Sequence, residues 1–130
     1  MISLLRVMIA ALLLVLSAPS RAQTAVGDAV RGKQVFQLCA ACHDIAPVPD
    51  TMPQGPPLAG IVGRGIGTVS GFDYSASLME LARQERLWSL ALLDRYLAAP
   101  WRLAPRTTMS FPGLSNDQER ADVIAFLETL

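Results

Sequence analysis

Two cysteines and a histidine stand close together about a third of the way along the chain. Cys39 and Cys42 are the only cysteines, His43 is the only histidine, and the three occur in the run Cys39-Ala40-Ala41-Cys42-His43. Residues three and four positions apart on a helix project to one side, so both thiols and the imidazole face a common point. In an exported protein this run is typical of covalent c-type haem attachment, with two thioethers to the haem vinyl groups and the histidine on the iron.

Three other chemistries compete for these residues. A zinc site needs four ligands, and the chain offers two cysteines and one histidine in total. A thioredoxin-like redox pair needs a βαβ setting, which the sequence lacks. A plain disulfide between Cys39 and Cys42 is open to an exported chain, but it leaves His43 without a role. Haem attachment is therefore the favoured interpretation.

With a single histidine, the second axial ligand of the iron must be another residue type. Methionine suits an electron carrier, because a Met/His pair raises the reduction potential. Beyond residue 22 the chain has three methionines: Met52, Met79 and Met109. We expect Met79 to be a core residue of a helix, and Met52 lies only nine positions after His43. Met109, in an extended loop 66 positions after His43, is the expected ligand; a core role for it, with an open iron, is the alternative.

The first 22 residues differ in composition from the rest. They contain a basic start, an apolar run from Val7 to Leu16, and the small residues Ser20 and Ala22 at the end. This pattern is typical of a secretory signal peptide, and a run of ten apolar residues is too short to span a bilayer. We expect cleavage after Ala22, a periplasmic location, and one domain over 23–130 with no stable membrane insertion. An uncleaved anchor or a core helix is the alternative.

The charge balance excludes several classes of partner. Without residues 1–22 the chain has 9 basic and 11 acidic side chains, a net charge of −2. No basic run indicates nucleic-acid binding, and no polybasic patch indicates a membrane surface. Lys33 is the single lysine, so the surface would steer a partner weakly or favour one with a positive rim.

Periodicity and capping residues predict an all-α domain of three main helices plus a short one. The expected helices cover 28–41, 75–83 (the short one), 89–98 and a last helix that starts with a capping box at 115–118. The proline- and glycine-rich segments 44–71 and 99–113 are expected to be irregular. Because about 45 of 108 residues lie in such loops, which cannot build a core alone, we expect the chain to wrap a large apolar cofactor.

Further stretches agree with one known family in order and spacing. They are Gly27-Asp28-Ala29-Val30-Arg31-Gly32-Lys33 with Phe36, Gly55-Pro56-Pro57-Leu58, Gly63-Arg64, Tyr74, Trp88, Tyr96-Leu97, Pro100, Pro105-Arg106-Thr107-Thr108-Met109 with Phe111, and Glu119-Arg120-Ala121-Asp122-Val123-Ile124-Ala125-Phe126-Leu127. With the Cys-x-x-Cys-His run, they make the chain from 27 to 130 resemble class I cytochromes c of the mitochondrial and bacterial c2 types. The resemblance implies the cytochrome c fold and one covalently bound haem c per chain.

The resemblance also implies roles around the haem. The carbonyl of Pro56 would accept the Nδ1 proton of His43 and so fix the tautomer of the ligand. Arg64, Tyr74 and Trp88 would hydrogen-bond the haem propionates, which are costly to bury without partners.

Other residues match the methionine side of the haem in this family. Tyr96 and Thr107 would line that side, and Phe111 would shield the haem edge. The chain also departs from the family, because the lysine ring around the exposed haem edge of mitochondrial forms is missing and Thr108 occupies one of its positions. Leu78 replaces an asparagine that helps to hold an internal water.

These observations favour a periplasmic one-electron carrier that is not an enzyme. It would be a monomer that meets a donor and an acceptor redox protein transiently. A dedicated electron-accepting cytochrome subunit of a periplasmic dehydrogenase is the alternative, with the same haem site and an obligate partner. An enzyme or gas sensor is a third hypothesis, and it requires an open iron.

Overall fold

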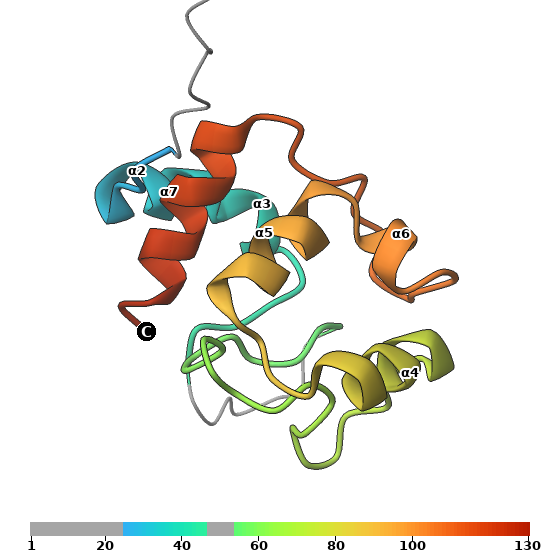
Figure 1. Ribbon diagram of the computed structural model, residues 1–130. Helices are drawn as coiled ribbons and strands as arrows, with labels where there is room; N and C mark the ends of the chain where they lie inside the picture. Colours follow the sequence, from blue (N-terminus) through green and yellow to red (C-terminus); the bar gives the residue numbers. More distant parts are fainter. Residues whose placement is uncertain (1–24, 47–53) are drawn as a thin grey trace, which may run out of the picture.

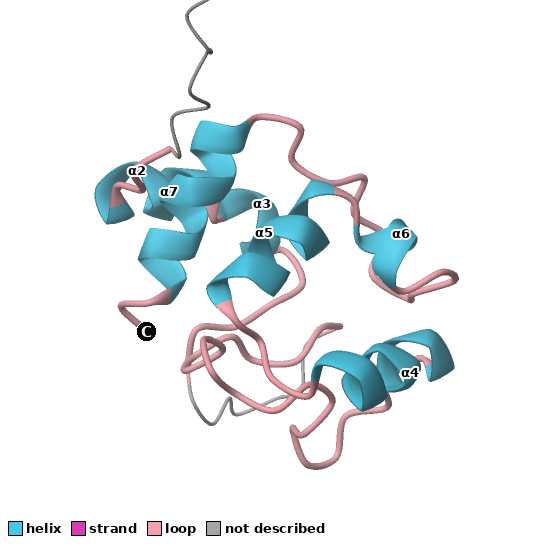
Figure 2. Ribbon diagram, in the orientation of Figure 1, coloured by secondary structure: helices cyan, strands magenta, loops and turns pink. Residues whose placement is uncertain are grey.

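The computed structural model describes residues 25–46 and 54–130, and helices are the main elements within them (Figures 1 and 2). The helices are α2 (Ala29–Val35), α3 (Gln37–Ala40), α4 (Ala76–Glu85), α5 (Leu90–Ala98), α6 (Pro100–Leu103) and α7 (Asp117–Leu127). The described residues form no strand beyond an isolated bridge between Gly65 and Leu87, and the all-α fold class is confirmed. No helix in these ranges is both long enough and apolar enough to cross a bilayer. The expected signal segment and Met52 lie outside the described residues.

Polar side chains at the helix starts explain where α2, α4, α5 and α7 begin. Asp28, Ser75, Ser89 and Asn116 each accept a hydrogen bond from a backbone N–H in the first turn of the helix that follows. These bonds satisfy donors that have no partner inside the helix. The capping box expected at 115–118 is wrong in register, because Asn116 caps α7 and the side chain of Gln118 turns elsewhere.

Two other boundaries differ from the sequence expectation. The first helix is interrupted at Phe36, where the N–H of Cys39 bonds the Phe36 carbonyl in a tighter, 3₁₀-type turn. The segment 99–113, expected to be irregular, contains the single-turn helix α6. Pro100 starts this helix, where its fixed φ is compatible with a helix and its missing N–H costs nothing.

The first described helix, α2, and the last, α7, cross closely. Figure 1 shows α2 lying against α7, although they stand near opposite ends of the described chain. A Cβ on Gly32 would overlap the backbone carbonyl of Asp122, so the absence of a side chain permits this approach. One turn further along, the rings of Phe36 and Phe126 pack with their centroids 5.2 Å apart. The crossing sets the position of α3 and of the cysteines that follow α2.

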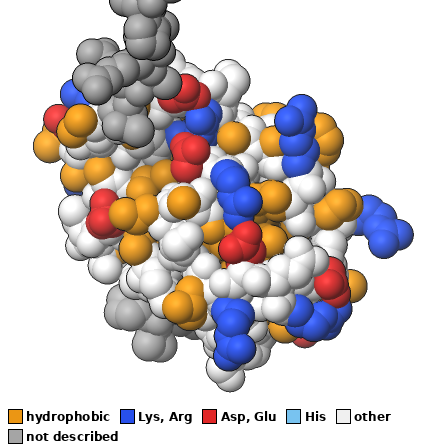
Figure 3. All heavy atoms as spheres, viewed as in Figure 1, with side chains coloured by type: hydrophobic (Ala, Val, Ile, Leu, Met, Phe, Trp, Pro, Cys, Tyr) orange, Lys and Arg blue, Asp and Glu red, His pale blue; other side chains and the backbone are white. Residues whose placement is uncertain are grey.

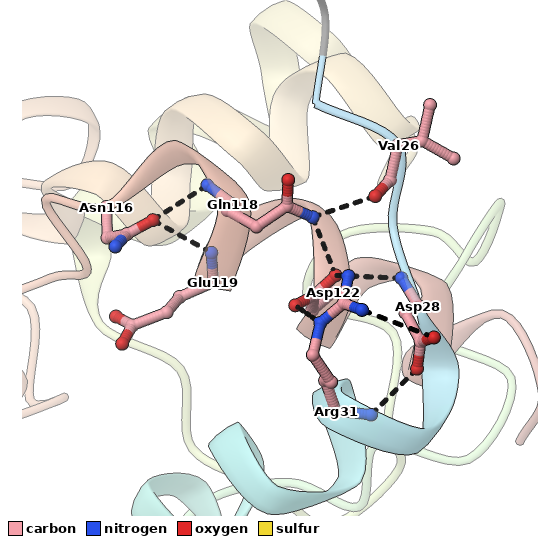
Figure 4. Close-up of polar contacts among 7 residues, drawn as sticks. All are labelled: Val26, Asp28, Arg31, Asn116, Gln118, Glu119 and Asp122. Atoms are coloured by element: carbon pink, nitrogen blue, oxygen red, sulfur yellow. Dashed lines mark hydrogen bonds and ion pairs between the residues drawn. The ribbon is translucent and has the colours of Figure 1, made fainter.

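A buried carboxylate fixes the same crossing (Figure 4). Asp122 accepts hydrogen bonds from Arg31 Nε at 2.7 Å, from the Asp28 N–H at 2.8 Å and from Gln118 Nε2 at 2.9 Å. Gln118 also donates to the carbonyl of Val26 at 2.8 Å, which ties the chain before α2 to α7. The ion pair with Arg31 lowers the pKa of Asp122 to about 2.

A second buried ionic group joins α7 to α5. The Arg120 side chain is nine-tenths buried, and its guanidinium contacts Asp94 at 2.8 Å and Asp117 at 2.6 Å. It also donates to the carbonyl of Leu114 at 2.8 Å, and the N–H of Leu114 bonds the Leu97 carbonyl at 2.8 Å. These contacts bring the loop after α6 back to α5. Figure 2 shows that the described chain between α3 and α4 contains no helix.

We predict that Gly32→Ala lowers the free energy of unfolding of the holoprotein by about 1–3 kcal/mol, because the new methyl group has no space at the α2–α7 crossing. Denaturant unfolding followed by circular dichroism measures this loss. Gln34→Ala, on the exposed side of α2, is the control and should change stability by less than about 0.5 kcal/mol. Equal stability of the two variants would show that the helices separate without cost.

We predict that the effect of Asp122→Asn depends on pH. Because the folded pKa of about 2 lies below the ordinary value near 3.9, the carboxylate adds stability that is complete above about pH 4 and is lost as the pH falls towards 2. Asp122→Asn should therefore lower the unfolding midpoint in denaturant at pH 6 and have less effect at pH 2. Glu119→Gln, an exposed change on the same helix, is the control. A pH-independent loss would assign the effect to packing rather than to charge.

Candidate cofactor-binding site

A single cavity of about 220 Å³ brings the expected site residues together. Its walls come from α3, α4, α5, α7 and the loops around them, and its other lining side chains are mostly apolar, including Leu78, Leu93 and Leu97. All eleven residues expected from the sequence line it: Cys39, Cys42, His43, Pro56, Arg64, Tyr74, Trp88, Tyr96, Thr107, Met109 and Phe111.

The end of α3 positions both thiols. The N–H groups of Cys42 and His43 bond the carbonyl of Cys39 at 3.0 and 2.9 Å, so the helical turn continues through His43. Both cysteines are free and half-buried, and the Sγ of Cys42 lies 3.5 Å from Oε1 of Gln54. Burial raises the pKa of the Cys39 thiol. Among the described residues no group of three or more His, Cys, Asp or Glu side chains is arranged to hold a metal ion, so these thiols have no zinc ligand set there.

The imidazole of His43 is held by the backbone that follows it. Its Nδ1 lies 2.7 Å from the carbonyl of Pro56, and this hydrogen bond keeps the ring proton on Nδ1 and leaves the lone pair of Nε2 for a metal. Burial lowers the pKa of His43, which favours the neutral form that ligates metals. A Cβ on Gly55 would overlap the imidazole ring, so the ring rests directly on the Gly55 backbone.

The loop after α6 supplies the thioether. Met109 lines the cavity, and the hydroxyl of Tyr96 donates to its Sδ at 3.8 Å. The N–H of Met109 bonds Oγ1 of Thr107 at 3.3 Å, which fixes the backbone of the loop. Trp88 packs edge-on against Tyr96 with ring centroids 4.9 Å apart. Burial raises the pKa of Tyr96, so its hydroxyl keeps the proton that it donates.

Polar groups suited to an anionic substituent lie in another part of the wall. The guanidinium of Arg64 donates to the carbonyls of Ala59 and Pro57 at 3.0 and 2.9 Å. Burial lowers the pKa of Arg64 from its ordinary value. The hydroxyl of Tyr74 accepts from the N–H of Val69 at 3.2 Å, so its own proton is free for another acceptor.

Met79 does not belong to this set. The expectation that Met79 is a core residue is wrong: it is 38% exposed and does not line the cavity. The buried face of α4 is formed by Leu78 and Leu81, and Met79 lies beside that face, against Gly67. Met52 lies outside the described residues.

Gly55 and Leu38 are among the lining residues that sequence reasoning missed as site residues. Gly55 supports the imidazole, and a signal for it was present, because a glycine directly before Pro56 permits close backbone approach. Leu38 lines the mouth of the cavity while 62% exposed, and no sequence pattern distinguishes it from a surface leucine.

The residues present fit a haem. Two thiols three positions apart, an imidazole with a free Nε2, a thioether held by a phenol, and a largely apolar wall are the groups that such a cofactor requires.

Comparison with known proteins points to the same cofactor. A family model described as cytochrome c matches residues 29–130. A cytochrome c2 of Rhodomicrobium vannielii is 43% identical over 105 residues, covering 81% of each chain, and a cytochrome c of Gossypium barbadense is 41% identical over 103 residues, covering 78% of this chain and 89% of that one. Among solved structures, cytochrome cH from Methylobacterium extorquens matches with a TM-score of 0.71 and 35% identity, covering 80% of this chain and 100% of that one.

We predict that Gly55→Ala displaces the imidazole of His43 and lowers the unfolding free energy of the holoprotein by about 1–3 kcal/mol. The visible spectrum of the oxidised protein should change with it, because the orientation of the ligand changes. Ile45→Ala is the control, since Ile45 is exposed, close to His43 in sequence, and outside the cavity lining. An unchanged spectrum and stability in Gly55→Ala would mean that the ring has more room than the structure gives it.

Proposed function

Because the chain belongs to the cytochrome c family and binds a covalently attached haem c, we propose that it is a periplasmic one-electron carrier with His43 and Met109 as axial ligands of the iron. The observation that carries this proposal is that His43, with its Nε2 free, and Met109, with its Sδ held by Tyr96, line one cavity. When bound, the haem supplies an iron that alternates between Fe(II) and Fe(III), one electron at a time.

In this proposal the residues at the end of α3 both attach the haem covalently and ligate its iron. Cys39 and Cys42 form the two thioether bonds, and His43 ligates through Nε2. The Pro56 carbonyl holds the proton at Nδ1, which fixes the ring and strengthens the ligand. Gly55 supplies the surface on which the ring lies.

Met109 ligates through its thioether, which favours a raised potential. The hydroxyl of Tyr96 donates to the sulfur and orients it, and Thr107 holds the loop. Trp88, packed on Tyr96, and Phe111 exclude water from this part of the cavity.

The haem propionates are the groups that need polar partners. We assign them to Arg64, Tyr74 and Trp88, because a guanidinium, a free phenol proton and an indole N–H line the cavity, and the backbone N–H of Trp88 bonds the Arg64 carbonyl at 2.9 Å.

The location and mode of action complete the proposal. Residues 1–22 direct export and are removed after Ala22, and the domain over 23–130 acts in the periplasm. It transfers electrons as a monomer in transient contacts with redox proteins, has no catalytic role and binds no nucleic acid. The apolar run and the small residues before position 23 support the export step, and the family match over 29–130 supports the extent of the domain.

We predict that Met109→Ala opens the sixth coordination position. The reduced protein should then bind carbon monoxide, and the reduction potential should fall on the order of 100 mV, a fraction of the ~0.8 V range that axial ligands span. Met79→Ala is the matched control, because Met79 is outside the cavity lining. If Met109→Ala behaves like Met79→Ala in carbon monoxide binding and in redox titration, Met109 is not the ligand.

A further inference from the structure

Among the described residues, the exposed side chains that line the cavity carry no charge. The exposed residues among its lining are Leu38, Gln54, Thr108 and Ser110, which we call the neutral rim. Arg64 is the one Lys or Arg in the lining as described; it is half-buried, and its guanidinium donates to two backbone carbonyls. In the described part of the lining there is no carboxylate.

The charges of the described surface lie elsewhere, and many are paired. Arg31, Arg83, Arg95 and Arg120 each form ion pairs with nearby carboxylates, so their fields largely cancel at a distance. On the face shown in Figure 3, most basic side chains lie towards α4, α5 and α6.

Arg102 belongs to α6 and Arg106 follows that helix, and neither is part of the neutral rim. Arg102 stacks on the exposed ring of Trp101, with its Cζ 5.1 Å from the ring centroid, and Arg106 precedes Thr108 by two residues. Neither lines the cavity. The field of either charge at the neutral rim is screened over about 8 Å at physiological ionic strength.

An uncharged rim favours partners whose contact surface is also uncharged. A partner with charged groups around its own redox centre would lose their hydration against Leu38 and Thr108 without gaining an opposite charge. A partner with an uncharged, apolar surface would instead remove Leu38, now 62% exposed, from water at no such cost.

Resting on the proposed function, we propose that the neutral rim docks redox partners whose contact surface is itself uncharged and apolar. Burial of Leu38 drives the contact, and charge pairing across the mouth does not. Association and electron transfer at this surface therefore depend little on salt.

Gold electrodes coated with defined monolayers test this directly. One monolayer is a mixture of methyl- and hydroxyl-terminated thiols, and the other is carboxylate-terminated. The adsorbed mass of the holoprotein and its redox current are measured on both surfaces. We expect at least about threefold more protein on the neutral monolayer, with less than about twofold loss on raising the salt from 20 to 300 mM.

Three variants make the test specific to the rim. Leu38→Ser should reduce adsorption on the neutral monolayer by about threefold or more, because the apolar contact is lost. Thr108→Lys should increase salt-sensitive adsorption on the carboxylate monolayer. Leu90→Ser is the control, since Leu90 is 44% exposed and does not line the cavity, and it should behave as the parent protein does.

Two outcomes overturn the docking proposal: salt-sensitive preference of the parent protein for the carboxylate surface, or equal losses in Leu38→Ser and Leu90→Ser. A redox titration in solution with small mediators distinguishes failure of the docking proposal from failure of the proposed electron-carrier function. A one-electron couple in solution together with either outcome rejects the docking surface alone. The absence of any couple in solution rejects the electron-carrier function, and the docking proposal with it.

Discussion

The interior of this protein faces a cavity rather than closing on itself. Phe36, Leu93, Leu97, Val123 and Leu127 belong to the buried core, and each also lines the space around Cys39 and His43. An apolar wall without a neighbour loses dispersion contacts, and admitting water would cost hydrophobic free energy. A bound haem removes both costs. The helices and the haem would therefore share one core, and the loops that line the cavity would cover the cofactor.

The polar groups in that core are few, and backbone or aromatic groups set their directions. The Pro56 carbonyl orients His43, the Tyr96 hydroxyl orients Met109, and carbonyl oxygens hold the guanidinium of Arg64. No buried polar side-chain atom of the described residues lacks a hydrogen-bond partner. Polar groups whose directions are already fixed need little rearrangement when a bound cofactor changes charge.

Local signals predicted the fold well where one residue decides the outcome. Ser89 caps the start of α5 and Pro100 follows its end, as expected, and Cys39, Cys42 and His43 line one cavity as their spacing predicts. Sequence reasoning failed where tertiary packing decides. Met79 has leucine neighbours, but one step of 100° around α4 takes it out of the core. The capping box expected at 115–118 is absent: Asn116 caps α7, and the side chain of Gln118 donates instead to the Val26 carbonyl and to Asp122, across distant segments.

The pairing of α2 with α7 has a consequence for the order of assembly. Chains are synthesised from the amino end, and α2 has no partner for its Gly32 face until the last turns of the chain emerge. Closure of such a long loop comes late and costs entropy before its contacts form. Until then the crossing that positions α3 cannot form, so the thiols of Cys39 and Cys42 reach their final places late in folding.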